Sequence, residues 1–490
     1  MGFPLISKLP ADTFLAKSAS QKNPINTMIY IPRTSRRSFL RGIAGITAAS
    51  AFPNFLRAQG AGKKIGIASI GVGGKGDSDA SAAAEGNEMV AICDVDANTL
   101  AKAQQKYPNA KAFTDFRKML DEVKSIEAVT ISTPDHAHYP AAMHALQHGK
   151  HLFIQKPLTN TLWENRELHL AARKKKVITQ MGNQGHTYEG NRVTTEWVKA
   201  GAIGKVKEIH VWTNRPIWPQ GKSAVLNHSG KVPTTLDWQQ WLAQSPEDIY
   251  SDNVHTFKWR GFLEYGAGAF GDMGCHLMDA PFVACGLKVP SFVTATQVDD
   301  LTEIAWPTGS VVKLEFTNVA GHGDIPFTWY EGKKPDGSPY LPEFPSSIDM
   351  AEAFGGKISA GGWMIVGTEG VILNKKDQAD GMQLWPKSRR DAFPADKIPK
   401  TETRSVRQGN PQQEWAEAIR NGKEFETMGH FDYSVPLTET TLIGGLAMRF
   451  PGKRLAWDSA ALKVTNNEDA NKFIKRAKYR AGWEYSAAKV

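Results

Sequence analysis

Cysteine is scarce in this chain, which has three such residues among 490: Cys93, Cys275 and Cys285. An odd and small number of cysteines does not make a disulfide framework. Cys93 ends an apolar segment and is predicted to be an inert thiol in the core. A single bridge between Cys275 and Cys285 stays open as an alternative.

Long apolar runs are also lacking. No stretch reaches the roughly 18–20 residues that a membrane-spanning helix needs. Hydrophobic residues make up 41 % of the chain and charged residues 22 %, which is ordinary for a folded globular protein and excludes a disordered one. We therefore expect two or three domains and no stable membrane span.

The net charge of +9 does not indicate nucleic-acid binding. Residues 1–58 hold eight Lys or Arg residues against one acid, which leaves 51 basic and 49 acidic side chains in the remaining chain. No long basic run occurs there, so no nucleic-acid partner is expected.

Residues 1–58 are predicted to be an export signal. Ser35-Arg36-Arg37-Ser38-Phe39-Leu40 precedes a mildly apolar stretch, 42–52, and Leu56-Arg57-Ala58 offers a small residue for cleavage. The paired arginines resemble the twin-arginine signal, which implies the twin-arginine machinery as a partner and a periplasmic or secreted location. A chance Arg-Arg pair before an amphipathic helix is the alternative, and an internal start at Met28 would shorten the leader.

A glycine-rich turn follows the first apolar segment, 64–70. Gly71, Gly73, Gly74 and Gly76 lie in Gly71-Val72-Gly73-Gly74-Lys75-Gly76, which fits G-x-G-x-x-G, and a second strand, 88–93, ends at Asp94. The glycines allow a tight turn, a close approach to a pyrophosphate and close packing of a helix on a strand. Asp94 lies 18 residues after Gly76, where an acid accepts hydrogen bonds from ribose hydroxyls and repels a 2′-phosphate. The pattern predicts NAD as the cofactor, in preference to NADP.

The alternation of strands and helices continues to about residue 184. Strands are predicted at 111–113, 128–132, 151–154 and 177–180, with helices between them, which indicates a doubly wound parallel sheet over residues 63–184. Ligands of such sheets bind at the carboxyl ends of the strands. The polar residues there are predicted to contact the cofactor: Thr133, Asp135, His138, Gln155, Lys156 and Asn183.

Residues 185–490 are predicted to form a second, α+β domain. Strands are expected at 206–212, 291–298, 310–316, 363–366 and 370–373, and because few helices separate the later ones, a largely antiparallel open sheet is favoured. Pro and Gly are frequent over 326–362, which is therefore predicted to be a long surface excursion.

One motif of the second domain carries acid–base chemistry. In Gly268-Ala269-Phe270-Gly271-Asp272-Met273-Gly274-Cys275-His276, Asp272 and His276 are i and i+4 neighbours on a predicted helix. A histidine beside a carboxylate is oriented and made more basic, which suits general acid–base catalysis. A capping Asp and a structural His are the alternative.

These motifs together resemble the glucose–fructose oxidoreductase, inositol dehydrogenase and MocA (Gfo/Idh/MocA) family. The match rests on the glycine fingerprint, on Thr133-Pro134-x-x-x-His138, on Lys156-Pro157 after a strand, and on Asp272-x-x-x-His276. It implies an N-terminal Rossmann domain, a C-terminal substrate domain, Lys156, Asp272 and His276 as catalytic residues, and a homo-oligomer. The family usually has Glu-Lys-Pro where this chain has Gln155, which is therefore expected only to contact the cofactor.

The resemblance implies an NAD(P)-dependent oxidoreductase that acts on a CH–OH group of a carbohydrate. An aromatic stretch, 212–260, holds five tryptophans that are expected either to stack on sugar rings or to lie in the core. The residues predicted to contact the substrate are His186, Tyr188, Arg215, Trp218, Arg260 and Tyr265.

Export in a folded state favours a cofactor that is tightly bound and regenerated in place. Such a cycle would either oxidise one sugar and reduce another, or assist the cleavage of a glycoside by transient oxidation. A sugar-binding protein without turnover and a cytoplasmic dehydrogenase with a misread leader remain alternatives. His136, His138, His144, His148 and His151 form a local group, but no metal is expected because the pattern lacks a matching set of acids.

Overall fold

A computed structural model describes residues 62–228, 230–423 and 426–490 of the chain. The predicted export signal lies outside these residues. The described residues belong to one compact unit. None of the helices among them is long and apolar enough to cross a bilayer.

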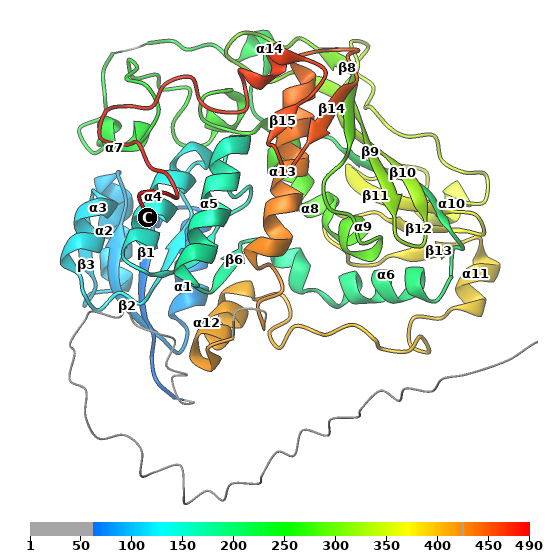
Figure 1. Ribbon diagram of the computed structural model, residues 1–490, viewed down its shortest axis with the longest axis horizontal. Helices are drawn as coiled ribbons and strands as arrows, with labels where there is room; N and C mark the ends of the chain where they lie inside the picture. Colours follow the sequence, from blue (N-terminus) through cyan, green and yellow to red (C-terminus); the bar gives the residue numbers. More distant parts are fainter. Residues whose placement is uncertain (1–61, 229, 424–425) are drawn as a thin grey trace, which may run out of the picture. The chain divides into compact units, whose positions relative to one another are not determined.

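The first domain is built on a six-stranded sheet in which every neighbouring pair is parallel (Figure 1). Its strand order is β3-β2-β1-β4-β5-β6, so the order reverses between β1 and β4, where doubly wound sheets bind ligands. The predicted Rossmann architecture is confirmed. Its strands are β1 (Gly66–Ile70), β2 (Glu88–Cys93), β3 (Lys111–Phe113), β4 (Ala128–Ile131), β5 (His151–Ile154) and β6 (Thr179–Met181), and its helices are α1 (Lys75–Ala84), α2 (Ala97–Lys106), α3 (Phe116–Glu122), α4 (Asp135–Gln147) and α5 (Leu162–Lys175).

The second domain is built on a nine-stranded sheet of order β13-β12-β11-β7-β10-β9-β8-β14-β15. Only β7 and β10 pair in parallel, so the prediction of a largely antiparallel sheet is confirmed. The strands are β7 (Val206–Thr213), β8 (Phe292–Asp299), β9 (Gly309–Val319), β10 (Gly323–Gly332), β11 (Gly361–Gly367), β12 (Val371–Asn374), β13 (Gln383–Trp385), β14 (Leu455–Asp458) and β15 (Lys463–Val464). The helices of this half are α6 (Glu189–Lys199), α7 (Trp238–Leu242), α8 (Gly268–Leu277), α9 (Asp279–Ala284), α10 (Met350–Phe354), α11 (Lys387–Ala392), α12 (Pro411–Asn421), α13 (Phe431–Met448) and α14 (Glu468–Asn471), with 3₁₀ turns at Gln184–Thr187, Gly221–Ser223 and Lys258–Gly261.

The predicted surface excursion over 326–362 is wrong at its start. Residues 326–332 belong to β10, which pairs with both β7 and β9 in the middle of the sheet. Ile325, Phe327 and Trp329 are fully buried, while Pro326 between them lies on the exposed face. The alternation of apolar and outward residues is that of a strand, and the proline conceals it in the sequence.

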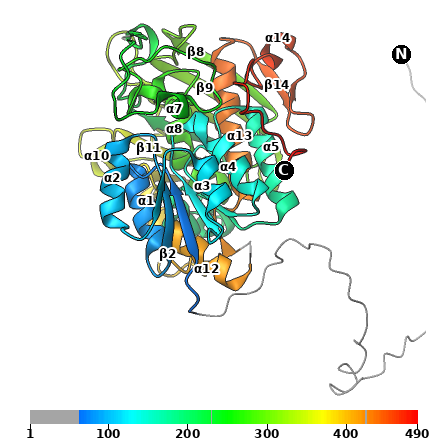
Figure 2. The same ribbon diagram turned by 90° about the vertical axis from the view of Figure 1, so that its left-hand side faces the viewer.

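Helix α12 packs on the first domain although it lies far beyond the predicted boundary at residue 185 (Figures 1 and 2). Trp415 is fully buried, and its ring centroid lies 5.9 Å from that of Phe153 in β5. The side-chain amide of Gln413 donates to the backbone carbonyls of Ala82 and Glu85 at the end of α1. A late segment of the chain therefore completes the core of the first domain.

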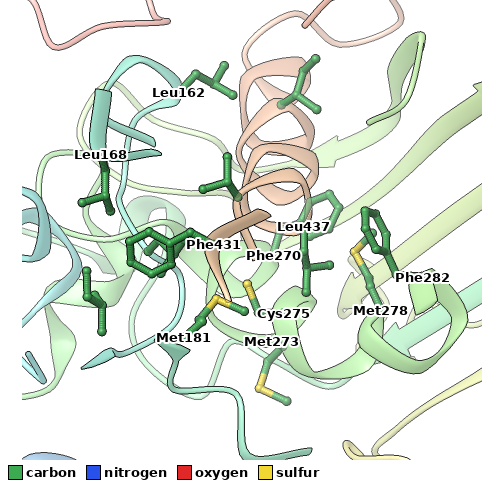
Figure 3. Packing of buried hydrophobic residues seen from close by; sticks show 14 of the residues in the cluster. Leu162, Leu168, Met181, Phe270, Met273, Cys275, Met278, Phe282, Phe431 and Leu437 are labelled. Atoms are coloured by element: carbon green, nitrogen blue, oxygen red, sulfur yellow. The ribbon is translucent and has the colours of Figure 1, made fainter. Parts of the chain in front are cut away.

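The helix that carries Asp272 and His276 is fixed by close packing between α8 and α13 (Figure 3). Phe270 of α8 stacks on Trp329 of β10, with ring centroids 4.5 Å apart. A Cβ atom on Gly444 of α13 would lie 2.0 Å from Cε1 of Phe270, so only glycine allows the two helices to approach this closely. Because such interiors are densely packed, α8 has one position relative to both sheets.

Candidate active site

A cavity of about 670 Å³ lies at the carboxyl ends of the parallel strands and reaches the facing residues of α8 and of the loop before it. Its size is typical of small-molecule sites. The predicted residues that line it are Gly71, Gly73, Gly74, Asp94, Thr133, Asp135, His138, Gln155, Lys156, Arg260, Asp272 and His276. The cavity therefore joins the glycine turn of the first domain to the predicted catalytic motif of the second.

The glycine turn adopts a conformation that other residues would strain. Gly71 has φ +77°, and a Cβ atom on Gly76 would lie 2.0 Å from the carbonyl oxygen of Gly71. The absence of side chains lets α1 begin directly against β1. No side chain caps the N-terminus of α1, and Gly73, Gly74 and Lys75 at this end line the cavity, so the helix terminus is open to a pyrophosphate.

Asp94 lies at the end of β2, where the sequence places a ribose ligand. Its Oδ2 accepts a hydrogen bond from the amide of Val72 at 2.9 Å, and its Oδ1 accepts one from the amide of Asp96 at 3.0 Å. Burial raises the pKa of Asp94, against the lowering effect of these two hydrogen bonds. The turn, the open helix terminus and this carboxylate fit a dinucleotide whose adenosine ribose has no 2′-phosphate.

Gln155 is held by a carboxylate that the sequence analysis missed. Its Nε2 donates to Oδ2 of the fully buried Asp79 at 2.8 Å, and Ser132 donates to the same oxygen at 2.8 Å. Asp79 also forms an ion pair with Lys75 and accepts a hydrogen bond from Gln412 of α12 at 2.6 Å. Since a carboxylate only accepts, the Gln155 amide nitrogen faces Asp79 and its Oε1 is left for the cavity. Asp79 lies within α1, and no motif in the sequence marks it.

Lys156 and Asp272 form an ion pair inside the cavity. Nζ of Lys156 lies 2.8 Å from Oδ1 of Asp272 and 2.7 Å from its backbone carbonyl, and Nε of Arg260 lies 3.3 Å from the same Oδ1. Burial opposes ionisation of Asp272, but the charges of Lys156 and Arg260 outweigh it and lower the pKa to about 2. The structure thus brings two of the three predicted catalytic residues, Lys156 and Asp272, into direct contact.

The tautomer of His276 follows from its neighbours. Nδ2 of Asn183 donates to the carbonyl of Cys275 at 2.6 Å, so Oδ1 of Asn183 faces Nδ1 of His276 at 3.0 Å. The side-chain amide of Gln378 lies 3.4 Å from the same Nδ1, and its otherwise unpartnered Oε1 suits this contact when the amide is turned over. Both neighbours then accept from Nδ1, which carries the proton, and Nε2 keeps a lone pair.

Burial and the nearby charge of Lys156 lower the pKa of His276 to about 3, so the ring is neutral at pH 7. The raising effect of Asp272 is outweighed, and the expectation that this carboxylate makes His276 more basic is wrong.

Asp135 and His138 hold the chain around the cavity. Oδ2 of Asp135 accepts from the amide of Ala267 at 3.0 Å, and burial raises the pKa of Asp135 to about 7. Both ring nitrogens of His138 lie 2.9 Å from backbone carbonyl oxygens, those of Pro157 and Thr133. His138 therefore braces the segments that carry Thr133 and Lys156, and neither of its nitrogens is free for a ligand.

Several residues predicted from the sequence to contact ligands do not line this cavity. His186 binds Asp279 at 2.8 Å and stacks on Tyr433, and the hydroxyl of Tyr265 donates to Asp248 at 3.2 Å. In both cases a carboxylate of the chain takes the polar atom that a ligand would need. The residues outside the cavity lining are Asn183, which positions His276, Gly76, which packs against Gly71, and His186, Tyr188, Arg215, Trp218 and Tyr265.

An aromatic wall of the cavity was only partly predicted. Trp241, Phe257 and Trp259 line it together with His255 and Arg260, whose guanidinium lies 4.2 Å from the ring centroid of Trp259. The aromatic stretch 212–260 was the signal for this wall. Trp212, Trp218 and Trp238 of the same stretch are buried away from the cavity lining.

All three cysteines are free and buried, so the alternative of a Cys275–Cys285 bridge is excluded. Burial raises the pKa of Cys93 well above its usual value, first through desolvation and then through the nearby charges of Asp94 and Asp115. Cys93 is therefore the inert core thiol that the sequence predicts.

Two family models match the chain. The model described as "Oxidoreductase family, NAD-binding Rossmann fold" matches residues 65–183, and that described as "Oxidoreductase family, C-terminal alpha/beta domain" matches residues 203–287. The chain belongs to the Gfo/Idh/MocA oxidoreductase family. Its first domain is thus the NAD-binding domain of that family.

Curated relatives of this family member match over part of their length. An oxidoreductase of Schizosaccharomyces pombe is 32 % identical over 202 residues, which are 40 % of this chain and 43 % of the relative. A levoglucosan dehydrogenase of Pseudarthrobacter phenanthrenivorans is 23 % identical over 188 residues, 38 % of this chain and 40 % of the relative. A D-glucoside 3-dehydrogenase of Escherichia coli is 28 % identical over 196 residues, 38 % of this chain and 54 % of the relative. Each match spans less than two thirds of the relative.

Solved structures share the fold over more of the chain. The WlbA dehydrogenase of Bordetella pertussis, in complex with NADH and UDP-GlcNAcA, superposes with a TM-score of 0.54 at 16 % identity and covers 81 % of this chain and 99 % of its own. A levoglucosan dehydrogenase in complex with NADH superposes with a TM-score of 0.52 at 17 % identity and covers 79 % of this chain and 98 % of its own. At these identities the likeness establishes the two-domain fold.

Proposed function

We propose that this protein is an NAD-dependent oxidoreductase that acts on a hydroxyl group of a sugar or glycoside. One observation carries the proposal: Lys156, Asp272 and the neutral His276 line the same cavity as the glycine turn and Asp94. Relatives that are named as dehydrogenases of levoglucosan, a D-glucoside and inositol support a sugar or polyol as the substrate class. Trp241 and Trp259 border the cavity, but Trp241 stacks on Trp238 and the Arg260 guanidinium lies over Trp259, so the substrate class rests on the relatives.

NAD, when bound, supplies the acceptor for the hydride that leaves the substrate carbon. The chain's own residues then handle the proton and the charge. His276 accepts the hydroxyl proton at Nε2, because Asn183 keeps the proton of the ring at Nδ1. Lys156 donates a hydrogen bond to the substrate oxygen and stabilises the negative charge that develops on it.

Asp272 and Arg260 set the position and the electrostatics of Lys156. The carboxylate and the backbone carbonyl of Asp272 both accept from Nζ, which leaves one N–H of the ammonium for the substrate. Reduction of a carbonyl runs through the same groups in reverse, with the proton returned from His276. The arrangement therefore serves either direction of the reaction.

We further infer export through the twin-arginine route with the cofactor already bound and recycled in place. The inference rests on Arg36-Arg37 and on the apolar stretch that follows, which lie outside the described residues. Fractionation of the tagged full chain tests it: wild type should reach the periplasm or the medium, and the Arg36→Lys/Arg37→Lys variant should stay in the cytoplasm. Equal distribution of the two would overturn the export inference. Dinucleotide that exchanges freely on dialysis would overturn the recycled cofactor.

The activity is tested on protein purified without added cofactor. Absorbance near 340 nm is followed while sugars, polyols and aryl glycosides are added one at a time, with NAD in excess. We expect a rise in absorbance with one substrate class in wild type and a rise at least about 10²-fold slower in Lys156→Met. Release of an aglycone without net formation of NADH would indicate redox-assisted cleavage of a glycoside instead of simple dehydrogenation. Sugar binding with no turnover in either protein would refute the enzyme proposal.

A further inference from the structure

A second cluster of ligating side chains lies outside the proposed active site, on the far end of α4. His144 is in the last turn of α4, His148 caps its C-terminus, and Asp121 of α3 faces both. Nε2 of His144 lies 3.3 Å from Oδ1 of Asp121, and Nε2 of His148 lies 3.0 Å from the same oxygen. The two imidazole rings thus converge on one carboxylate oxygen.

We propose that Asp121, His144 and His148 bind a divalent transition-metal ion of the zinc class. Two histidines spaced i, i+4 on one helix face point to the same side, and a carboxylate oxygen from a neighbouring helix adds a third ligand. The potential ligand atoms all lie within 4.8 Å of one another. In a tetrahedral zinc site with bonds of about 2.0–2.1 Å, neighbouring ligand atoms are about 3.3 Å apart, so small side-chain rotations suffice.

The surroundings of the cluster suit a bound metal. The hydroxyl of Tyr485 lies 3.3 Å from Nδ1 of His144, which is the outer contact that orients a metal-binding imidazole. The side chain of His144 is 13 % exposed and that of His148 is 27 % exposed, while that of Asp121 is 57 % exposed. The imidazoles are therefore held by the fold, and the open side leaves a fourth position for water.

No metal was expected from the sequence, where the nearby histidines were treated as one group. The structure divides that group: His136 and His138 bind backbone carbonyls, whereas His144 and His148 share the carboxylate of Asp121.

Such an ion would tie the C-terminal segment to the first domain. The ring of Trp483 lies edge-on to Phe116 of α3, with centroids 5.8 Å apart, and the carbonyl of Tyr485 accepts from the hydroxyl of Tyr139 of α4 at 3.1 Å. Because Tyr485 also contacts His144, a metal on His144 would stabilise this contact between the C-terminal segment and α4. The expected consequence is a higher unfolding temperature with the metal than without it.

Cobalt titration of the untagged, chelator-dialysed full chain tests the site. We expect one equivalent of Co²⁺ to bind with visible d–d absorption, and Zn²⁺ to displace it. His148→Ala should weaken the binding at least tenfold, and Tyr485→Phe by about tenfold. Both variants should keep the wild-type circular dichroism spectrum.

His169→Ala is the matched control. His169 binds Asp432 at 2.6 Å, but Arg173 stands where a second imidazole would be needed. This variant should bind Co²⁺ as wild type does, and Zn²⁺ should raise its unfolding temperature as in wild type. No saturable Co²⁺ binding by wild type, or equal binding by His148→Ala, overturns the proposal and leaves a hydrogen-bonded triad. Oxidoreductase activity is not needed for either readout, so this test is independent of the proposed function.

Discussion

Replacing Lys156 by methionine removes one charge from the cavity and keeps most of the volume of the side chain. Asp272 then loses the cation that lies 2.8 Å from its Oδ1 and retains Arg260 at 3.3 Å. Lowering of the Asp272 pKa from 3.8 to about 2 in the folded state corresponds to about 2 kcal/mol of stability at pH 7. Loss of one partner of a buried pair costs about 3–5 kcal/mol when nothing compensates. Because Arg260 compensates in part, we expect the free energy of unfolding of Lys156→Met to be lower than that of wild type by about 2 kcal/mol.

The pH dependence of this loss has a definite sign. The pKa of Asp272 is depressed in the folded state, so its ionised form stabilises the fold above the unfolded pKa of about 3.8, and that contribution is lost as the pH falls towards 2. Urea unfolding should give a constant difference in the free energy of unfolding between wild type and Lys156→Met at pH 5 to pH 6. The difference should widen towards pH 8, because loss of the Lys156 charge further raises the pKa of Asp135. The difference in the free energy of unfolding should narrow below pH 4.

Lys106→Met is the control for charge removal. Lys106 pairs with Asp77 at 2.7 Å, but the two side chains are 44 % and 55 % exposed. An exposed pair contributes at most about 1 kcal/mol, so this variant should be almost as stable as wild type and fully active.

The activity of Lys156→Met should fall by about 10²- to 10³-fold in kcat, the usual effect of losing a donor that stabilises the charge developing on the substrate oxygen. Absorbance at 340 nm with the substrate found in the sugar panel measures it. Wild-type activity would refute the catalytic role of Lys156. A stability loss no larger than that of Lys106→Met would refute the electrostatic reasoning.

Three further variants test the surroundings of the site. Asn183→Ala removes the acceptor that fixes the tautomer of His276, so kcat should fall roughly tenfold or more while NAD affinity is kept; an unchanged kcat would contradict the tautomer assignment. Asp135→Asn tests the carboxyl whose pKa is raised to about 7. Because Asp135 ionises more readily in the unfolded chain than in the fold, its carboxyl destabilises the fold by up to about 4 kcal/mol as the pH rises from about 4 to 7. Urea unfolding should therefore show Asp135→Asn gaining stability relative to wild type between pH 5 and pH 8. A constant difference in the free energy of unfolding would contradict the raised pKa of Asp135. Asp79→Asn weakens the hold on Gln155, so the Kd for NAD, read from fluorescence quenching, should rise by roughly tenfold with a smaller change in kcat, and equal affinities would refute this positioning role.

The first domain was predictable because its signals are local. Apolar strands, a glycine turn and an acid at a fixed distance each dictate a short piece of backbone, and the rule that parallel strands end at one edge of the sheet gathers Asp94, Asp135 and Lys156 without further information. The strand from 88 to 93 has the same bounds in the sequence prediction and in the structure. β10 was missed because Pro326 hides its alternation.

The substrate side of the cavity was much less predictable. The loop between β7 and α8 has no period, so composition names its aromatic residues but does not say which of them faces the cavity. Trp241 and Trp259 line it, whereas Trp218 turns inward and donates its indole N–H to Gln220 at 2.9 Å. His186 was a reasonable candidate by position, but its partner Asp279 lies on a helix that only the tertiary fold brings near.

The sequence by itself determined the nucleotide-binding half, because backbone geometry ties the glycine turn and the following acid to a fixed place beside the first strands. The prediction of Lys156, Asp272 and His276 as catalytic residues rests on the resemblance to the Gfo/Idh/MocA family, together with the i, i+4 spacing of Asp272 and His276. Only the tertiary structure decided that Asn183 orients His276, that Asp79 holds Gln155, and that His144 and His148 share Asp121. These contacts join residues from separate elements, and the direction of each side chain is set by packing against neighbours that the local sequence does not contain.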